Sequence, residues 1–288
     1  MSKKIFKRIG RALLNCGPKT ITKVNFAPVN YGNILSSKKV IITGGSKGIG
    51  YAMAKKFISE GAHVIITGRT EETLKKACDT LGNNCSYIVY DATDIKDIDL
   101  FLQRCTSIFG EHPNVLVCNA GISLHESSFE EVTESSFDKQ FNTNFKSVYF
   151  LTKSFISSFN IDSRTNDNNV AANILIVSSE TGDMAYDIPY GMTKASLNSM
   201  VGGISRRCYK KRIRINAISP GLTMTNLIDQ SEITRDNLTV KGQASGRIFL
   251  PEEVAEVACF LISDSSICIS GEVIHCNAGN HLRTNISE

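Results

Sequence analysis

The sequence predicts an α/β fold in which one doubly wound parallel sheet of about seven strands carries helices on both faces. Two observations lead to this prediction. After residue 39, short runs rich in β-branched residues alternate with longer stretches of helical spacing. The short runs are apolar throughout, as in strands that helices cover on both sides. The predicted strands are 40–43, 63–67, 87–90, 114–118, 173–177, 213–218 and 272–276.

The stretches between these runs show helical spacing. Pro251, followed by Glu252 and Glu253, is typical of a helix start, because proline has the required φ and acids favour the positive end of the helix dipole. The predicted helices are 49–60, 70–81, 94–109, 134–160, 190–209 and 251–263.

Composition excludes several classes of protein. The chain is 42% hydrophobic and 21% charged, which suits a globular domain, and no window approaches the length of a membrane-spanning helix. Its nine cysteines are scattered, without a C-x-x-C pair, which favours reduced thiols and a cytoplasmic location. The histidines show no metal-ligand spacing, so no metal is expected. No basic stripe interleaved with aromatics predicts nucleic acid as a partner.

The basic charge is concentrated at the N-terminus. Residues 1–36 contain seven Lys or Arg and no acid, and they are interpreted as an extension that precedes a domain at 37–288. As a helix, residues 3–14 would be amphipathic. Docking on the domain is the preferred interpretation, ahead of weak contact with an anionic membrane surface and of a cleaved transit peptide.

A glycine-rich turn follows the first strand. Residues 43–50 read TGGSKGIG, and a helix is predicted directly after them. Glycines allow backbone N–H groups to approach a pyrophosphate, and the helix start adds partial positive charge. The position of this turn, after the first strand of an alternating pattern, predicts a dinucleotide site, although its T-G-x-x-x-G-x-G spacing departs from the common G-x-G-x-x-G fingerprint. The residues of the predicted site are Gly44, Ser46, Lys47, Gly48, Ile49 and Gly50.

The end of the second strand predicts which dinucleotide binds. An acid there would bind a free ribose diol, whereas a cation would bind a 2′-phosphate. The strand ends in Thr67-Gly68-Arg69, without an acid, and Lys47 supplies a second cation. This pattern favours NADP(H) over NAD(H).

The chemistry is predicted from residues 178–194. Ser178-Ser179-Glu180-Thr181-Gly182 precedes Tyr190, and Lys194 follows Tyr190 by one helical turn. The ammonium of Lys194 can then lie near the phenol and is expected to lower its pKa from about 10. Such a phenol would exchange a proton with a carbonyl or alcohol oxygen while nicotinamide exchanges the hydride.

Together, over about residues 38–282, these motifs resemble the short-chain dehydrogenase/reductase family, including its 3-oxoacyl-reductase-like members. The resemblance implies a carbonyl or alcohol substrate and a homo-oligomer, dimer or tetramer, formed through helices 134–160 and 190–209. It implies the catalytic residues Asn144, Ser179, Tyr190 and Lys194, with Ser178 as the alternative serine. It implies that the cofactor also contacts Arg69, Asp91, Ala92, Asn119, Ala120, Gly121, Tyr190, Lys194, Pro220, Gly221 and Thr225.

Some features depart from the family pattern. Cys118 replaces the first Asn of an N-N-A-G motif. Ten residues separate Ser179 from Tyr190, slightly fewer than usual, so loop 183–189 should turn tightly and reshape the pocket. Residues 222–248 occupy the place of a substrate lid, and their polarity indicates either a polar substrate or a surface loop.

Two other functions stay open at this point. A sugar-nucleotide epimerase or dehydratase would share the Tyr and Lys chemistry, but it would carry a different glycine spacing and an additional substrate domain. A catalytically silent NADP(H)-binding sensor or scaffold would be expected to lack Tyr190, Lys194 or Ser179, and all three are present.

Overall fold

The computed structural model describes residues 21–159, 170–225 and 234–282, and its centre is one parallel sheet. The strand order is β3-β2-β1-β4-β5-β6-β7, with every neighbouring pair parallel. This confirms the predicted doubly wound sheet of seven strands. The strands are β1 (Lys39–Thr43), β2 (His63–Gly68), β3 (Cys85–Val89), β4 (Val115–Cys118), β5 (Ala172–Val177), β6 (Ile213–Pro220) and β7 (Val273–Cys276).

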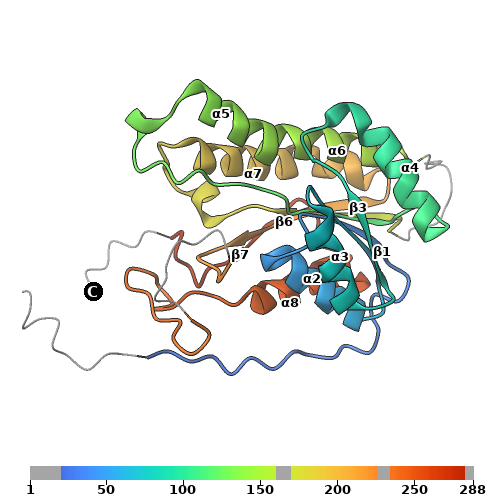
Figure 1. Cartoon of the computed structure of the whole chain (residues 1–288), viewed down its shortest axis with the longest axis horizontal. Coiled ribbons are helices and arrows are strands. Elements are labelled where there is room, and N and C mark those ends of the chain that lie inside the picture. Colours follow the sequence, from blue (N-terminus) through green and yellow to red (C-terminus); the bar gives the residue numbers. More distant parts are fainter. Residues whose placement is uncertain (1–20, 160–169, 226–233, 283–288) are drawn as a thin grey trace, which may run out of the picture.

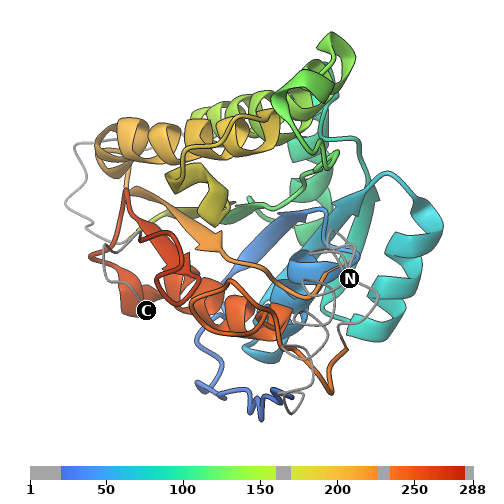
Figure 2. The same ribbon diagram turned by 90° about the vertical axis from the view of Figure 1, so that its left-hand side faces the viewer.

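Helices cover both faces of the sheet, as Figure 1 shows and as the turned view in Figure 2 confirms. On the upper face in Figure 1 are α4 (Ile98–Phe109), α5 (Glu134–Phe141), α6 (Ser147–Ser157) and α7 (Pro189–Tyr209). On the lower face are α2 (Gly48–Ser59), α3 (Glu71–Leu81) and α8 (Pro251–Ile262). Short helical turns are η1 (Ile95–Asp97), η2 (Phe129–Glu131), η4 (Glu180–Asp183) and η5 (Asp264–Ser266).

Alternate side chains of the central strands enter two separate cores. In β1, Ile41 packs among α4, α6 and α7, while Val40 and Ile42 pack among α2, α3 and α8. The same division in the other strands explains why their sequences are apolar without alternation. The sheet is therefore buried on both faces, and its strand ends form the edge where a site can be built.

The predicted helix 134–160 is present from Glu134 to Ser157, but it is not α-helical throughout. Between α5 and α6 the helical backbone continues as a π-helix, η3 (Asn142–Lys146), which the spacing did not indicate. A π-helix changes which side chains face inward, and such turns occur often at functional sites. At the start of α8, Pro251 occupies the first turn as predicted, and the Leu250 N–H donates to the Glu253 carboxylate.

Several predictions concern residues outside the described ranges, among them the docking of residues 3–14. Within the described ranges, no helix combines the length and apolar character needed to cross a membrane. The same residues contain no cluster of three or more potential metal-ligating side chains.

Candidate active site

The glycine-rich turn has a backbone that larger residues would disrupt. Gly44 and Gly48 have φ of 67° and 58°, in the left-handed region. A Cβ on Gly50 would lie 2.4 Å from the Gly44 carbonyl oxygen, so the turn closes only with glycine there. Within the described chain, Lys47 at the N-cap of α2 makes no side-chain capping hydrogen bond. The first N–H groups of α2 are thus available to an anion.

Asn119 holds this turn in place. Its side-chain amide donates to the carbonyl oxygens of Thr43 and Gly44, both at 2.9 Å. The Thr43 hydroxyl in turn accepts from the backbone N–H groups of Asn119 and Ala120, at 3.0 and 3.1 Å. The Asn119 side chain therefore binds the backbone of the glycine-rich turn. Cys118, buried beside it, has a long contact of 4.0 Å with the Thr152 hydroxyl.

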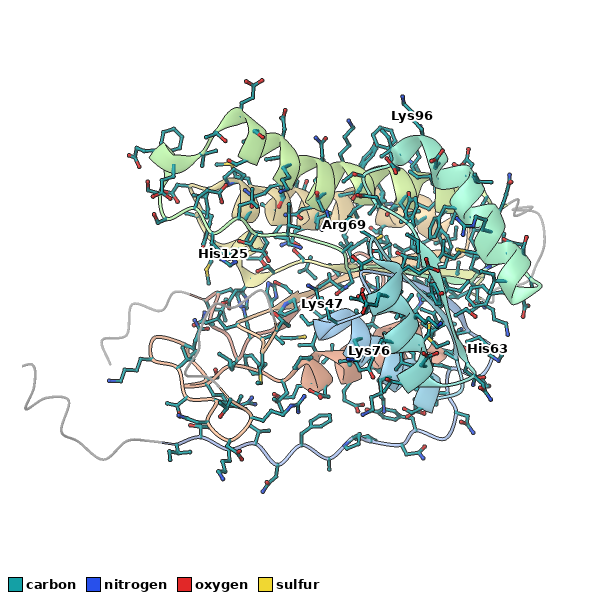
Figure 3. The ribbon with its side chains drawn as sticks, viewed as in Figure 1. Lys47, His63, Arg69, Lys76, Lys96 and His125 are labelled. Atoms are coloured by element: carbon teal, nitrogen blue, oxygen red, sulfur yellow. The ribbon has the colours of Figure 1, made fainter. Side chains whose placement is uncertain are left out.

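The two predicted cations lie at the carboxyl edge of the sheet. Lys47 lies in the turn after β1, Arg69 follows the end of β2, and both are exposed. Figure 3 shows both well away from His63, which lies at the opposite end of β2. Their placement suits a doubly charged group at this edge.

Asp91 and Ala92 follow β3 at the same edge. The Asp91 carboxylate accepts from the backbone N–H and the hydroxyl of Thr93, at 2.9 and 2.8 Å, and so fixes a turn. Ala92 packs at the margin of the upper core. Both residues are half-buried.

The π-helix places Asn144 in the interior. Asn144 is buried, and its amide makes a reciprocal pair with the backbone of Ile122, with both distances at 2.8 Å. A Cβ on Gly121 would lie 3.4 Å from Asn144 Oδ1 and 3.7 Å from Lys194 Nζ. The structure thus brings Gly121, Asn144 and Lys194 together.

The two serines after β5 have different roles. Ser178 is buried, and its hydroxyl lies 2.6 Å from Asn198 Oδ1 and 3.3 Å from the Lys194 carbonyl oxygen, so it joins the strand to α7. Ser179 is half-exposed, accepts from the Thr181 hydroxyl at 3.1 Å, and lies where its hydroxyl acts to lower the pKa of the Tyr190 phenol. This geometry favours Ser179 over Ser178 as the reactive serine.

Tyr190 and Lys194 share one face of α7. Lys194 Nζ lies 5.6 Å from the centre of the Tyr190 ring and donates to the Val177 carbonyl oxygen at 3.0 Å. Burial lowers the Lys194 pKa to about 8. Burial also raises the Tyr190 pKa, while the Ser179 hydrogen bond opposes this shift. The predicted lowering of the Tyr190 pKa was therefore wrong in direction, because desolvation outweighs the effect of neighbouring groups.

The end of β6 approaches the glycine-rich turn. Pro220 ends β6, and the Gly221 N–H donates to the Cys276 carbonyl oxygen at 3.1 Å. A Cβ on Gly48 would lie 3.3 Å from the Thr225 methyl group, so Thr225 faces the turn. Residues 226–233 of the predicted lid lie outside the described ranges.

The short loop before α7 packs closely on that helix. Tyr186 packs so closely on Gly191 that a Cβ there would lie 2.4 Å from the Tyr186 Cβ. Asp183, at the end of η4, accepts from Asn198 Nδ2 at 3.0 Å and lies 2.8 Å from His275 Nε2. Sequence reasoning missed Asp183, Asn198 and His275, because nothing in their spacing indicates that α7 and β7 meet this turn.

Comparisons with known proteins agree with this arrangement. A family model described as enoyl-(acyl carrier protein) reductase matches residues 44–281. A 3-oxoacyl-(acyl-carrier-protein) reductase of Chlamydia trachomatis is 29% identical over 249 residues, covering 85% of this chain and 98% of that protein. The corresponding reductase of Chlamydia muridarum is 30% identical over 251 residues, covering 86% and 98%.

Solved structures of proteins with similar sequences have the same fold. ElxO with NADP bound is 30% identical, with a TM-score of 0.74 over 84% of this chain and 98% of that one. The 3-ketoacyl-(acyl-carrier-protein) reductase of Brucella melitensis, complexed with NADH, is 27% identical, with a TM-score of 0.75 over 86% and 100%. This chain is therefore a member of the short-chain dehydrogenase/reductase family, an oxidoreductase that resembles 3-oxoacyl reductases.

Proposed function

We propose that the chain is an NADP(H)-dependent reductase that converts a ketone to a secondary alcohol, with Tyr190 as the general acid. The observation that carries the proposal is the convergence of Ser179, Tyr190, Lys194 and Asn144 at one end of the sheet. The similar 3-oxoacyl-(acyl-carrier-protein) reductases favour a 3-oxoacyl thioester as the first substrate class to test.

The residues at the sheet edge fit a nicotinamide dinucleotide. The glycine-rich turn leaves room for backbone N–H groups to reach a pyrophosphate, and α2 begins there without a side-chain cap. Lys194 would hold the nicotinamide ribose, and Gly121, Pro220, Gly221 and Thr225 would border the ring. Bound there, the nicotinamide supplies the hydride.

The residues of this chain manage the proton. Ser179 and Tyr190 would hold the substrate oxygen between their hydroxyl groups, and Tyr190 would donate its proton as charge develops on that oxygen. The raised pKa of Tyr190 keeps the phenol protonated at neutral pH, as a general acid requires. The charged Lys194 would stabilise the phenolate that forms, and Asn144 would hold a water that returns the proton.

The preference for NADP(H) depends on Lys47 and Arg69. Both are exposed cations at the carboxyl edge of the sheet, and no acid follows β2 directly. A 2′-phosphate would gain charge-assisted hydrogen bonds from them, whereas a free ribose would gain little. The similar structures contain NADP in one case and NADH in another, so only a measurement on this chain decides the preference.

We also propose a homo-oligomer, with a homotetramer expected, in the cytoplasm. Large apolar side chains are exposed on the helices that the resemblance assigns to subunit contacts, namely Phe137, Tyr149 and Met192. On α7, Val201 and Met200 are buried in the subunit's own core. The described cysteines are free thiols, as a reducing compartment favours.

A fluorescence titration with NADPH and, separately, NADH is the first test, followed by NADPH oxidation with acetoacetyl-CoA. We expect tighter binding of NADPH and consumption of NADPH that depends on the ketone. Preference for NADH would contradict the assignment of Lys47 and Arg69. Binding of NADPH without turnover of any carbonyl compound in a panel would make the chain a cofactor-binding sensor.

A further inference from the structure

Part of the N-terminal extension crosses the lower helix layer and reaches the C-terminal third of the chain. We call residues 21–31 the strap and residues 237–249 the hairpin. In Figure 1 the strap is the blue extended segment along the bottom, and its outer end meets the orange hairpin. The family model matches residues 44–281, so the strap lies outside the matched part of the chain.

The strap alternates as an extended strand does. Thr22, Val24 and Phe26 are half-buried, while Ile21, Lys23, Asn25 and Ala27 between them are exposed. Val24 and Phe26 pack on a small apolar cluster formed by Leu238, Ile248 and Leu250, which is separate from the two cores of the sheet. The strap therefore supplies one wall of a core for the hairpin.

Polar contacts fix the position of the strap along the hairpin. The Leu238 N–H donates to the Thr22 carbonyl oxygen at 3.0 Å, and the Thr22 N–H donates to Thr239 Oγ1 at 2.9 Å. The hydroxyl oxygens of Thr22 and Thr239 lie 3.0 Å apart. Leu238 is fully buried, so loss of its backbone partner would leave a buried donor unpaired.

The other end of the strap is anchored on the domain. The Tyr31 N–H donates to the Glu60 carboxylate at 3.0 Å, and Lys56 Nζ lies 4.7 Å from the centre of the Tyr31 ring. Lys56 also donates to the Val29 carbonyl oxygen and pairs with Glu60 and with Glu256 of α8. This anchor keeps the strap in reach of the hairpin.

The hairpin continues the contacts toward the candidate active site. The Ile248 N–H donates to the Leu238 carbonyl oxygen at 2.9 Å. Phe249 exchanges backbone hydrogen bonds, each 2.8 Å long, with Leu222 and Met224. Leu222 follows Gly221 directly, and Met224 precedes Thr225, which faces Gly48 of the glycine-rich turn.

We propose that the strap, by way of the hairpin, positions residues 222–225 beside the glycine-rich turn, with Thr22, Val24 and Phe26 as positioning residues. Residues 237–248 of the hairpin belong to the stretch 222–248 that the sequence predicts as a lid or a surface loop, and the apolar cluster of the hairpin is completed by residues that belong to the extension. Removing the strap contacts should loosen residues 222–224 and 237–249 together. The effect on catalysis rests on the proposed function, whereas the effect on the hairpin does not.

Hydrogen–deuterium exchange tests the structural part on the full chain without any substrate. In a Val24→Ala/Phe26→Ala variant we expect the Leu238 and Ile248 amides to exchange about tenfold faster or more, with the sheet unchanged. Ile21→Ala is the matched control, since it removes an apolar side chain that is 61% exposed on the same strap. Unchanged exchange in the double variant would overturn the proposal, whatever the activity of the enzyme.

Steady-state kinetics test the functional part. The double variant should raise the KM for the ketone about tenfold with a smaller change in kcat, since residues 222–225 would border the proposed site less firmly while Tyr190 and Lys194 stay in place. Thr22→Val, which removes only the hydroxyl, should give the same change in weaker form and serves if the double variant does not fold. Faster exchange with unchanged KM would show a purely structural strap and contradict the positioning role. Absence of turnover in the parent chain would contradict the proposed function and leave the exchange result to decide on the strap.

Discussion

Lys194 Nζ donates a hydrogen bond of 3.0 Å to the carbonyl oxygen of Val177, the last residue of β5. Among the described residues, this is the polar contact that the structure shows for the Lys194 ammonium, and the side chain is otherwise buried. Burial alone lowers its pKa to about 8 from 10.5. A charged amine is therefore held beside Tyr190 at the expense of stability, as functional sites often require.

The first prediction concerns stability and pH in the protein without cofactor. Because the Lys194 pKa is lower in the folded state, the unfolded state binds more protons between about pH 8 and 10.5, and stability from this group rises with pH there. Lys194→Met should raise the free energy of unfolding at neutral pH, by up to about 3 kcal/mol. Denaturant unfolding near pH 7 and pH 10 checks this. A difference between the two proteins that stays constant with pH would contradict it.

The second prediction concerns the pH dependence of ketone reduction. The raised Tyr190 pKa keeps the acid protonated in the range where Lys194 loses its charge. We expect kcat/KM for reduction to fall as pH rises through about 8, because neutral Lys194 no longer stabilises the phenolate. In Lys194→Arg the residual activity should lack this fall, since arginine stays charged. A fall at the same pH in both proteins would assign it to another group.

The third prediction concerns the general acid. Tyr190→Phe should keep NADPH binding and lower kcat by about 10²–10⁴-fold, the usual contribution of general acid catalysis. Tyr186→Phe is the matched control, since Tyr186 lies on the loop just before α7 and is 42% exposed. Stopped-flow reduction of acetoacetyl-CoA with saturating NADPH measures the chemical step. A Tyr190→Phe enzyme with undiminished turnover would remove Tyr190 from this role.

The sequence predicted the parts of the site that depend on local chain geometry. Glycine spacing around residues 43–50 and the one-turn separation of Tyr190 from Lys194 are local, and both appear as expected. The predicted direction of the Tyr190 pKa shift was wrong because the burial of Tyr190 depends on how α7 packs. Residue spacing in the sequence carries no information on that packing. The choice between Ser178 and Ser179 likewise required Asn198, twenty residues away in sequence, to show which hydroxyl is already used.

The contacts of the strap could likewise not be predicted from the sequence. The basic composition of residues 1–36 predicted an extension. Docking on the domain was the preferred interpretation, but it was made for residues 3–14, which lie outside the described ranges. The alternation of Thr22, Val24 and Phe26 is too short to stand out in the sequence. Its significance appears only when the hairpin, more than 200 residues later, lies beside it.

The fourth prediction concerns cofactor preference. Arg69→Asp should weaken NADPH binding about 10–100-fold, as expected for loss of hydrogen bonds between charged groups, and should change NADH binding far less. Lys76→Asp is the matched control, because it places an acid at an exposed cation of α3, outside both the glycine-rich turn and the end of β2. Fluorescence titration of both dinucleotides measures the ratio. Equal weakening of NADPH binding by both variants would indicate a general effect of charge.

The last prediction concerns the turn that carries Ser179. Asp183 at the end of that turn accepts hydrogen bonds from α7 and β6, through Asn198 at 3.0 Å and Ser219 at 3.4 Å, and its third contact is with His275 on β7 at 2.8 Å. Asp183→Ala should lower kcat about tenfold or more while the Kd for NADPH stays unchanged, because the turn loses its partners on three elements.

His275→Ala should have a smaller effect of the same kind, and the double variant should lose less than the sum of both, as contacting residues do. The imidazole ring of His281 stacks on His275 at 3.7 Å between ring centres, so His281→Ala serves as the control that disturbs β7 without removing the hydrogen bond. Additive losses in kcat for Asp183→Ala and His275→Ala would show that the two residues act independently, and the turn would then be held by its contacts with α7 and β6 alone.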